Sequence, residues 1–328
     1  MMPQSEHFPC SPRTEKQSRP VRVWVIMLVV AVLVLVGGIS GWRLVAQRHS
    51  TVEQISTDVS TDKVPSDADG SSPNSLADNG SKPKLDNQQF SALVKKQTTA
   101  HPKGQVGVSV MLLGTMGQLD TNHIYGDTNA EYAMRAYGLY IPVYLMAHNS
   151  GCVQTPAKGS PLDDCWGDEE SQRLTDDMMR NMDPVAGNAA IDRMGGIAKV
   201  NDWMITMYGD KNSFMSKLTS PEESVRQISN HTWSSNAVIM LQSVDERAGA
   251  DLMNADLTGL GVRIPDGMIV HAQYGKADGS YNVYAIVEDS TYRAAVSVMT
   301  ESIGDDDASE LITETLAELH RQLGALHE

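Results

Sequence analysis

The sequence is poor in cysteine, in aromatic residues and in positive charge. Three cysteines in 328 residues exclude a disulfide-rich scaffold and a multi-cysteine zinc site. Lys and Arg number 26 against 41 Asp and Glu, a net charge of −15, so the chain is poorly suited to bind nucleic-acid phosphates. It has no repeats, no H-E-x-x-H and no G-x-S-x-G motif, and His271 on a predicted strand is interpreted as structural. We therefore expect a globular domain without a metal or other cofactor.

The longest hydrophobic run lies near the beginning of the chain. It begins at Val23, ends at Trp42 and contains no charge, which is typical of a membrane-spanning helix. Four basic residues precede it within ten positions, so the positive-inside rule places residues 1–22 in the cytoplasm and the rest outside. The alternative is a cleaved signal peptide, but the run exceeds the usual length and no A-x-A site follows. We favour an uncleaved, single-pass anchor in the plasma membrane.

Residues 43–88 differ in composition from everything that follows. They are rich in Ser, Asp, Asn, Thr and Pro and nearly lack aromatic residues. Such a segment buries too little apolar surface to offset its chain entropy. We expect a disordered extracytoplasmic linker, followed by a folded domain over residues 89–328.

Helical and strand patterns alternate along this domain. An opening helix is expected at 87–98, a buried strand at 105–113 with a hairpin partner at 123–126, and a central buried helix at 134–148. Further helices are expected at 170–180, 188–194, 200–208 and 233–247, further strands at 268–274, 281–288 and 292–301, and a last helix from 305. This segregated order predicts an α+β fold with a mostly antiparallel sheet and the terminal helices on one face.

Four stretches carry a family resemblance. They read VGVSVMLL, AYGLYIPVYLMA, AGNAAIDRMGGIAKVNDWMITMYGD, and IPDGMIVHAQYG with YNVYAIVEDSTYRAAVSVMTE. In order and spacing they resemble the serine β-lactamase and penicillin-binding protein superfamily, in its class A type, over residues 90–326. The resemblance implies a five-stranded antiparallel sheet with flanking helices and a helical subdomain. It also implies acyl transfer by a serine, through S-x-x-K, S-D-N and K-T-G motifs.

The S-x-x-K motif is degenerate in this chain. Alignment on the Ile-Pro pair places Tyr137 where the nucleophilic Ser belongs and Tyr140 where the Lys belongs. A phenol with a pKa near 10 beside another phenol gains no base. Two literal S-x-x-K matches, at 60–63 and 81–84, lie in the linker and are interpreted as chance.

The other two motifs are also degenerate. Ala186-Gly187-Asn188 replaces S-D-N, so that only Asn188 survives, and Gln273-Tyr274-Gly275 replaces K-T-G, so that only Gly275 survives. The cation that would hold a substrate carboxylate is therefore lost. The loop that bears the deacylating Glu in class A enzymes is expected near 212–230, where Glu222 and Glu223 lie without a convincing motif match.

Cys152 and Cys165 flank a polar loop that the predicted topology places outside the membrane. A disulfide between them would contribute on the order of 3 kcal/mol in the chain-entropy model. Two free thiols are the alternative. The many methionines of the helical block are interpreted as core residues, with no cofactor assigned.

The losses at the motif positions predict a catalytically inactive, membrane-anchored domain that binds a cell-wall fragment or a protein partner. One alternative is a divergent serine hydrolase, of β-lactamase or D-Ala-D-Ala peptidase type, acting on β-lactam or peptidoglycan amide bonds. Another is a sensor or scaffold for a membrane protein partner. If the family cleft is open, we expect Tyr137, Tyr140, Asn188, Gln273 and Tyr274 to line it. Otherwise the tyrosines fill it.

Overall fold

The computed structural model describes residues 84–114, 123–149, 167–209, 211–223, 230–289 and 292–326. The predicted anchor at 23–42, nearly all of the linker, and both Cys152 and Cys165 lie outside these residues. Within the described ranges, no helix combines the length and the apolar character that crossing a bilayer requires.

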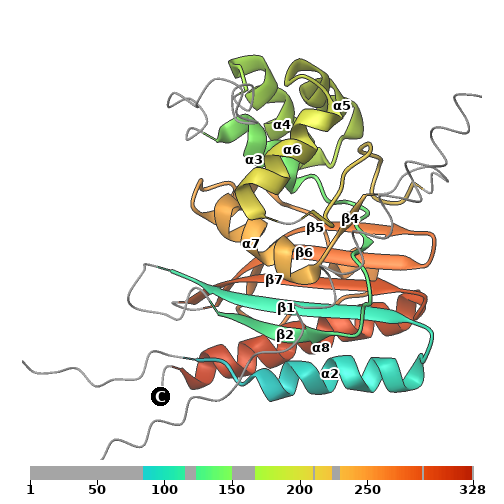
Figure 1. Ribbon diagram of the computed structural model, residues 1–328. Helices are drawn as coiled ribbons and strands as arrows, with labels where there is room; N and C mark the ends of the chain where they lie inside the picture. Colours follow the sequence, from blue (N-terminus) through green and yellow to red (C-terminus); the bar gives the residue numbers. More distant parts are fainter. Residues whose placement is uncertain are drawn as a thin grey trace, which may run out of the picture. The chain divides into compact units, whose positions relative to one another are not determined.

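A five-stranded antiparallel sheet forms the centre of the domain, in the order β2-β1-β7-β6-β5 (Figure 1). The strands are β1 (Gln105–Leu113), β2 (Ile124–Thr128), β5 (Ile269–Ala277), β6 (Ser280–Asp289) and β7 (Tyr292–Glu301). Helices cover both faces, which explains why β1 and β6 are buried along nearly their whole length instead of alternating between buried and exposed positions. The predicted α+β class and antiparallel sheet are confirmed.

The two terminal helices, α2 (Asn87–Ala100) and α8 (Asp305–Ala325), cover one face of the sheet (Figure 1). Their apolar sides meet the strands, with Phe90 and Leu311 fully buried. Lys96 of α2 contacts the Glu310 and Glu314 carboxylates of α8 at 2.9 and 2.6 Å. This arrangement confirms the prediction that the first and last helices pack together.

The opposite face carries α7 (Ser234–Asp245), and a helical subdomain lies beyond it (Figure 1). That subdomain contains α3 (Ile141–His148), α4 (Glu169–Asn181), α5 (Pro184–Arg193) and α6 (Ile197–Tyr208). Two short 3₁₀ helices, η2 (Ala250–Leu252) and η3 (Thr258–Leu260), precede β5. Methionine side chains are prominent in the core of the helical subdomain, as expected; they include Met146, Met178, Met179 and Met204.

The predicted helix at 134–148 is wrong in its first half. Met134 and Arg135 form strand β3, which pairs with β4 (His231–Thr232), and α3 begins only at Ile141. Gly138 has a φ of +70°, a left-handed conformation that interrupts a right-handed helix. Pro142 lies in the first turn of α3, where its missing N–H costs nothing. Hydrophobicity alone did not distinguish this strand and turn from the helix.

Candidate functional site

The positions of the first and third family motifs meet where α3 begins. A Cβ atom on Gly275 of β5 would collide with the Tyr137 carbonyl, and one on Gly138 would collide with the Tyr274 carbonyl. The two backbones are therefore in direct contact, and only glycine fits at these points. The structure therefore brings Tyr137-Gly138 and Tyr274-Gly275 together.

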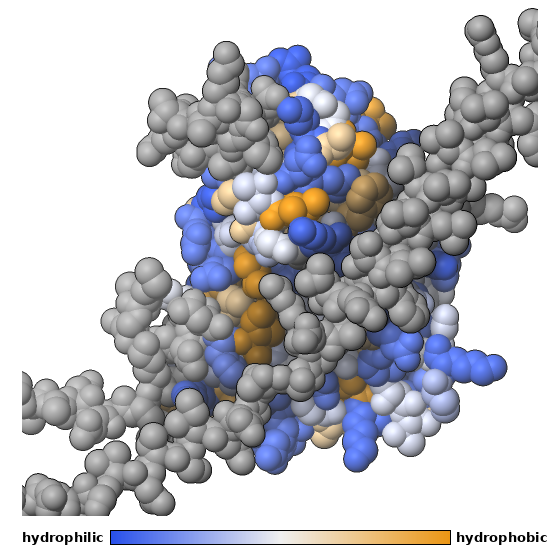
Figure 2. Space-filling view, viewed as in Figure 1, coloured by the Kyte–Doolittle hydropathy of each residue, from blue (hydrophilic) through white to orange (hydrophobic). Residues whose placement is uncertain are grey.

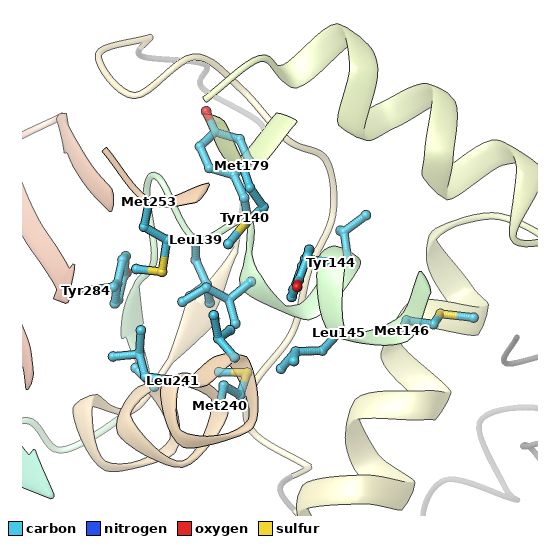
Figure 3. Packing of buried hydrophobic residues seen from close by; sticks show 14 of the residues in the cluster. Leu139, Tyr140, Tyr144, Leu145, Met146, Met179, Met240, Leu241, Met253 and Tyr284 are labelled. Carbon is cyan, nitrogen blue, oxygen red and sulfur yellow. The ribbon is translucent and has the colours of Figure 1, made fainter. Parts of the chain in front are cut away.

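Tyr140 occupies the N-cap position of α3 and is fully buried. Its hydroxyl lies 3.1 Å from the Met182 carbonyl oxygen and is also hydrogen-bonded to the Thr219 carbonyl oxygen. In Figure 3 its ring projects from the start of α3 on the side opposite Met240 and Leu241. Burial raises the pKa of this phenol well above its ordinary value, so it stays protonated at neutral pH. Tyr140 thus links α3 to two other segments and supplies no base.

Tyr137 is 5% exposed, and its hydroxyl donates to Asp278 Oδ2 at 2.7 Å. Burial, together with the neighbouring Asp278 carboxylate, raises the pKa of Tyr137 to about 12. The group at the position of the family nucleophile is therefore a protonated phenol that is already hydrogen-bonded.

The structure corrects the position assigned to the second motif. Ala186, Gly187 and Asn188 lie inside α5, whereas the family motif is a loop that precedes a helix. The segment before α5 is Met182-Asp183, and it is the Met182 carbonyl that contacts Tyr140. The error arose because the Asn and the later Gly-Gly turn matched, while the helix began one turn earlier than expected.

Neither Met182 nor Asp183 supplies a serine hydroxyl. Met182 adopts a left-handed φ of +48° at the end of α4, and the Asp183 side chain accepts from the Val185 amide as the N-cap of α5. The correction therefore leaves the loss of the second motif unchanged.

Asn188 instead holds a neighbouring loop in place. Its side-chain amide donates to the Leu218 carbonyl at 3.0 Å and accepts from the Leu218 amide at 3.2 Å. A further bond, to the Pro184 carbonyl at 2.7 Å, fixes the side chain on its own helix. Asn188 is thus a positioning residue.

Gln273, at the place of the family Lys, points into the protein. It is fully buried, and its Nε2 lies 3.1 Å from the sulfur of Met179. The Tyr274 hydroxyl, by contrast, donates a hydrogen bond to Glu222 Oε1 of an exposed loop at 3.1 Å. Neither side chain presents a cation to a substrate carboxylate.

Residues 218–223, which we call the covering loop, lie along β5. The Lys276 amide, immediately after Gly275, donates to the Pro221 carbonyl at 2.7 Å. In acyl-transfer sites, backbone amides of this kind stabilise the developing oxyanion. Here the loop engages the amide of Lys276, while Tyr140 binds Thr219 and Tyr274 binds Glu222. The loop expected near 212–230 includes this segment, but no sequence pattern indicated its contacts with β5 and Tyr140, because backbone carbonyls of Pro221 and Thr219 make them.

Comparison with known proteins agrees with this architecture. Residues 170–323 match a family model described as the β-lactamase enzyme family. The crystal structure of a β-lactamase from Sphaerobacter thermophilus aligns over 74% of this chain and 99% of that chain, with a TM-score of 0.53 and 17% identity. The domain has a serine β-lactamase-like fold.

Two further solved structures show the same fold as this β-lactamase-like domain. A variant of PBP-A, solved as an acyl-enzyme complex with penicillin G, aligns with a TM-score of 0.55 and 14% identity over 75% of this chain and 99% of its own. A β-lactamase from Desulfarculus baarsii gives 0.51 and 15% over 74% and 99%. No curated protein matches the chain.

His271 of β5 lies among charged side chains of the β-lactamase-like domain. Its Nε2 is 3.7 Å from Glu288 and 3.9 Å from Asp251. Among the described residues, no three His, Cys, Asp or Glu side chains form a group that could hold a metal ion.

Proposed function

We propose that this chain is a membrane-anchored, catalytically inactive β-lactamase-like domain that binds a cell-wall or protein partner outside the membrane. The observation that carries the proposal is the state of Tyr140. Where the family has an amine that activates the nucleophile, this chain has a buried phenol that bonds to the carbonyls of Met182 and Thr219. Its raised pKa keeps the hydroxyl protonated, so it accepts no proton from a neighbour.

Three further features support the loss of acyl transfer. The phenol of Tyr137 replaces a serine hydroxyl and donates to Asp278. Gln273 is buried against Met179 instead of offering a positive charge. The covering loop bonds to the Lys276 amide at the edge of β5. Each change removes a different component of the chemistry, so restoring one component would not restore turnover.

The binding role is supported by what the chain retains. The fold is preserved, although the residues at the catalytic motif positions of the family are replaced. The hydrophobic run at 23–42 would hold the domain at a membrane surface. A fold of this kind carries function in its sites and does not by itself define one.

Labelling of the full-length chain with a fluorescent penicillin tests the proposal. We expect no covalent adduct on the denatured protein, because no activated serine is available. The PBP-A variant that was solved as an acyl-enzyme complex with penicillin G is the positive control. An adduct would overturn the proposal in favour of a divergent serine hydrolase, and mass spectrometry would then identify the acylated residue.

A further inference from the structure

A surface hollow of about 390 Å³ lies at the end of the β5–β6 hairpin, beside the former catalytic region. Its lining residues come from the covering loop, the hairpin and the start of α8; they are Glu222, Lys276, Ala277, Asp278, Gly279, Ser280 and Asp305. We call it the hairpin hollow. Where Figure 2 shows the described residues, they are mostly hydrophilic, with apolar residues in smaller patches.

Two carboxylates of the hairpin hollow are held in place by the tyrosines described above. Asp278 and Gly279 have φ values of +52° and +74°, as a two-residue type I′ hairpin turn requires. This turn presents the Asp278 carboxylate, which accepts from Tyr137 at 2.7 Å. Glu222 likewise accepts from Tyr274 at 3.1 Å. The replacements that removed the catalytic groups thus fix the positions of two acidic groups.

The lining carries more negative than positive charge. It contains the carboxylates of Glu222, Asp278 and Asp305 against the single amine of Lys276, a formal charge of −2. The amine already lies 3.1 Å from Asp305. A second cation is therefore attracted to the hollow, whereas an anion is repelled.

Ser280 is independent evidence for a ligand at this hollow. The residue is 1% exposed and lines the hollow, and its hydroxyl has no hydrogen-bond partner among the described residues. A buried hydroxyl without a partner is costly, and most are satisfied in native structures. A donor group in the hollow would supply the missing partner.

The geometry distinguishes between kinds of cation. No group of three acidic or other metal-binding side chains in the described part of the chain is close enough to share a metal ion. The hollow, of about 390 Å³, is large enough for an organic group. An ammonium group has three donors and no acceptor, which matches two carboxylates and one hydroxyl.

We propose that the hairpin hollow binds the side-chain primary ammonium of a lysine-type residue in a peptide, with Glu222, Asp278 and the Ser280 hydroxyl as its acceptors. The proposal deepens the binding function proposed above and rests on it. The family resemblance implies that a lysine of the protein binds a carboxylate of the substrate. In this proposal the charges are exchanged, because carboxylates of the protein bind a cation of the ligand.

Ligand-observed NMR on the full-length chain, at low salt, tests the proposal with acetyl-Ala-Lys-Ala-amide as the probe. We expect saturable binding of this peptide, and at least about tenfold weaker binding when the lysine amine is acetylated or the lysine is replaced by glutamate. Equal binding of all three peptides, or no binding of the lysine peptide, would refute the proposal.

Charge variants provide a sign test. Glu222→Gln removes an acceptor carboxylate, so we expect roughly three- to tenfold weaker binding, whereas Lys276→Gln removes the resident cation and should strengthen binding by a similar factor. Glu169→Gln, at an exposed position on α4, removes the same charge elsewhere and should leave binding unchanged. Equal weakening by Glu169→Gln and Glu222→Gln would show a general charge effect and overturn the assignment.

Two sources of the amine can be separated in the same assay. Cell-wall peptides with a free side-chain amine and linear lysine peptides of the same length share the ammonium but differ in backbone. Preferential binding of either one identifies the source. Penicillin labelling tests only whether the domain is catalytically inactive. An adduct would refute that inactivity, and the peptide-binding assay would still test the ammonium site independently.

Discussion

The sheet with its terminal helices and the region between α3, α5 and β5 have changed in different ways within one domain. The first retains buried strands in a five-stranded antiparallel sheet, within a fold that a solved β-lactamase shares. In the second, tyrosines and the covering loop occupy the positions that the family motifs would take. Burial of apolar surface tolerates many sequences, whereas acyl transfer requires particular groups at particular atoms. A fold can therefore persist where the groups at its motif positions are replaced.

The largest expected effect lies in the first region. Leu311→Ala removes a fully buried side chain of α8 and should lower the free energy of unfolding by about 2–5 kcal/mol. Urea denaturation measures the loss. Val185→Ala is the control, because Val185 is 76% exposed and its truncation should have almost no effect. Equal effects would contradict the assigned core.

Backbone contact in the second region predicts a comparable loss at a small residue. Gly275→Ala places a methyl group against the Tyr137 carbonyl, so we expect a destabilisation of about 1–3 kcal/mol, or more if the backbone does not shift. Thermal unfolding measures it. In α8, Gly324→Ala meets open space and should stabilise the protein slightly, since alanine favours a helix. A neutral Gly275→Ala would show that the two backbones are not in contact.

Removing the Asn188 side chain should release the covering loop, and local hydrogen exchange distinguishes this effect from a loss of global stability. Asn188→Ala leaves the Leu218 amide and carbonyl without their side-chain partner, at a cost of about 1–3 kcal/mol. Hydrogen exchange should rise at Leu218 and at Lys276, whose amide donates to the covering loop. Unchanged exchange at Lys276 would mean that Asn188 does not position this loop. Asn181→Ala, at an exposed helix end, should change neither amide.

The smallest expected effect is a dependence on alkaline pH. The pKa of Tyr137 is about 12 in the folded protein and near 10 in the unfolded chain, so the unfolded state loses its proton first. Its contribution is fully present below pH 10 and is lost as the pH rises towards 12. Tyr137→Phe should flatten the decline in stability over this window, as measured by denaturant titration. An unchanged decline would place its cause elsewhere.

Element boundaries could be predicted where one physical pattern was dominant. Strand β1 and strand β7 were located at their observed ends. Helix α2 begins after its Asp86 cap, and α8 begins at Asp305, where three acidic residues form the first turn before an apolar periodicity. The prediction failed at 134–148, where a strand, a glycine turn and a short helix share one apolar composition. The predicted start of the helix that contains Asn188 was one turn too late, because matching a motif does not identify the residue at which a helix begins.

The sequence by itself determined which residues stand at the first and third motif positions, since residue types do not depend on conformation. It also determined the fold class, because hydrophobic periodicity reflects which side chains are buried. Only the tertiary structure decided what the replacing residues do. That the Tyr140 hydroxyl meets two carbonyls, that a loop covers the Lys276 amide, and that Glu222, Asp278 and Ser280 surround one hollow all depend on contacts between segments distant in the chain. Such contacts leave no local pattern, because they arise from the packing of whole elements.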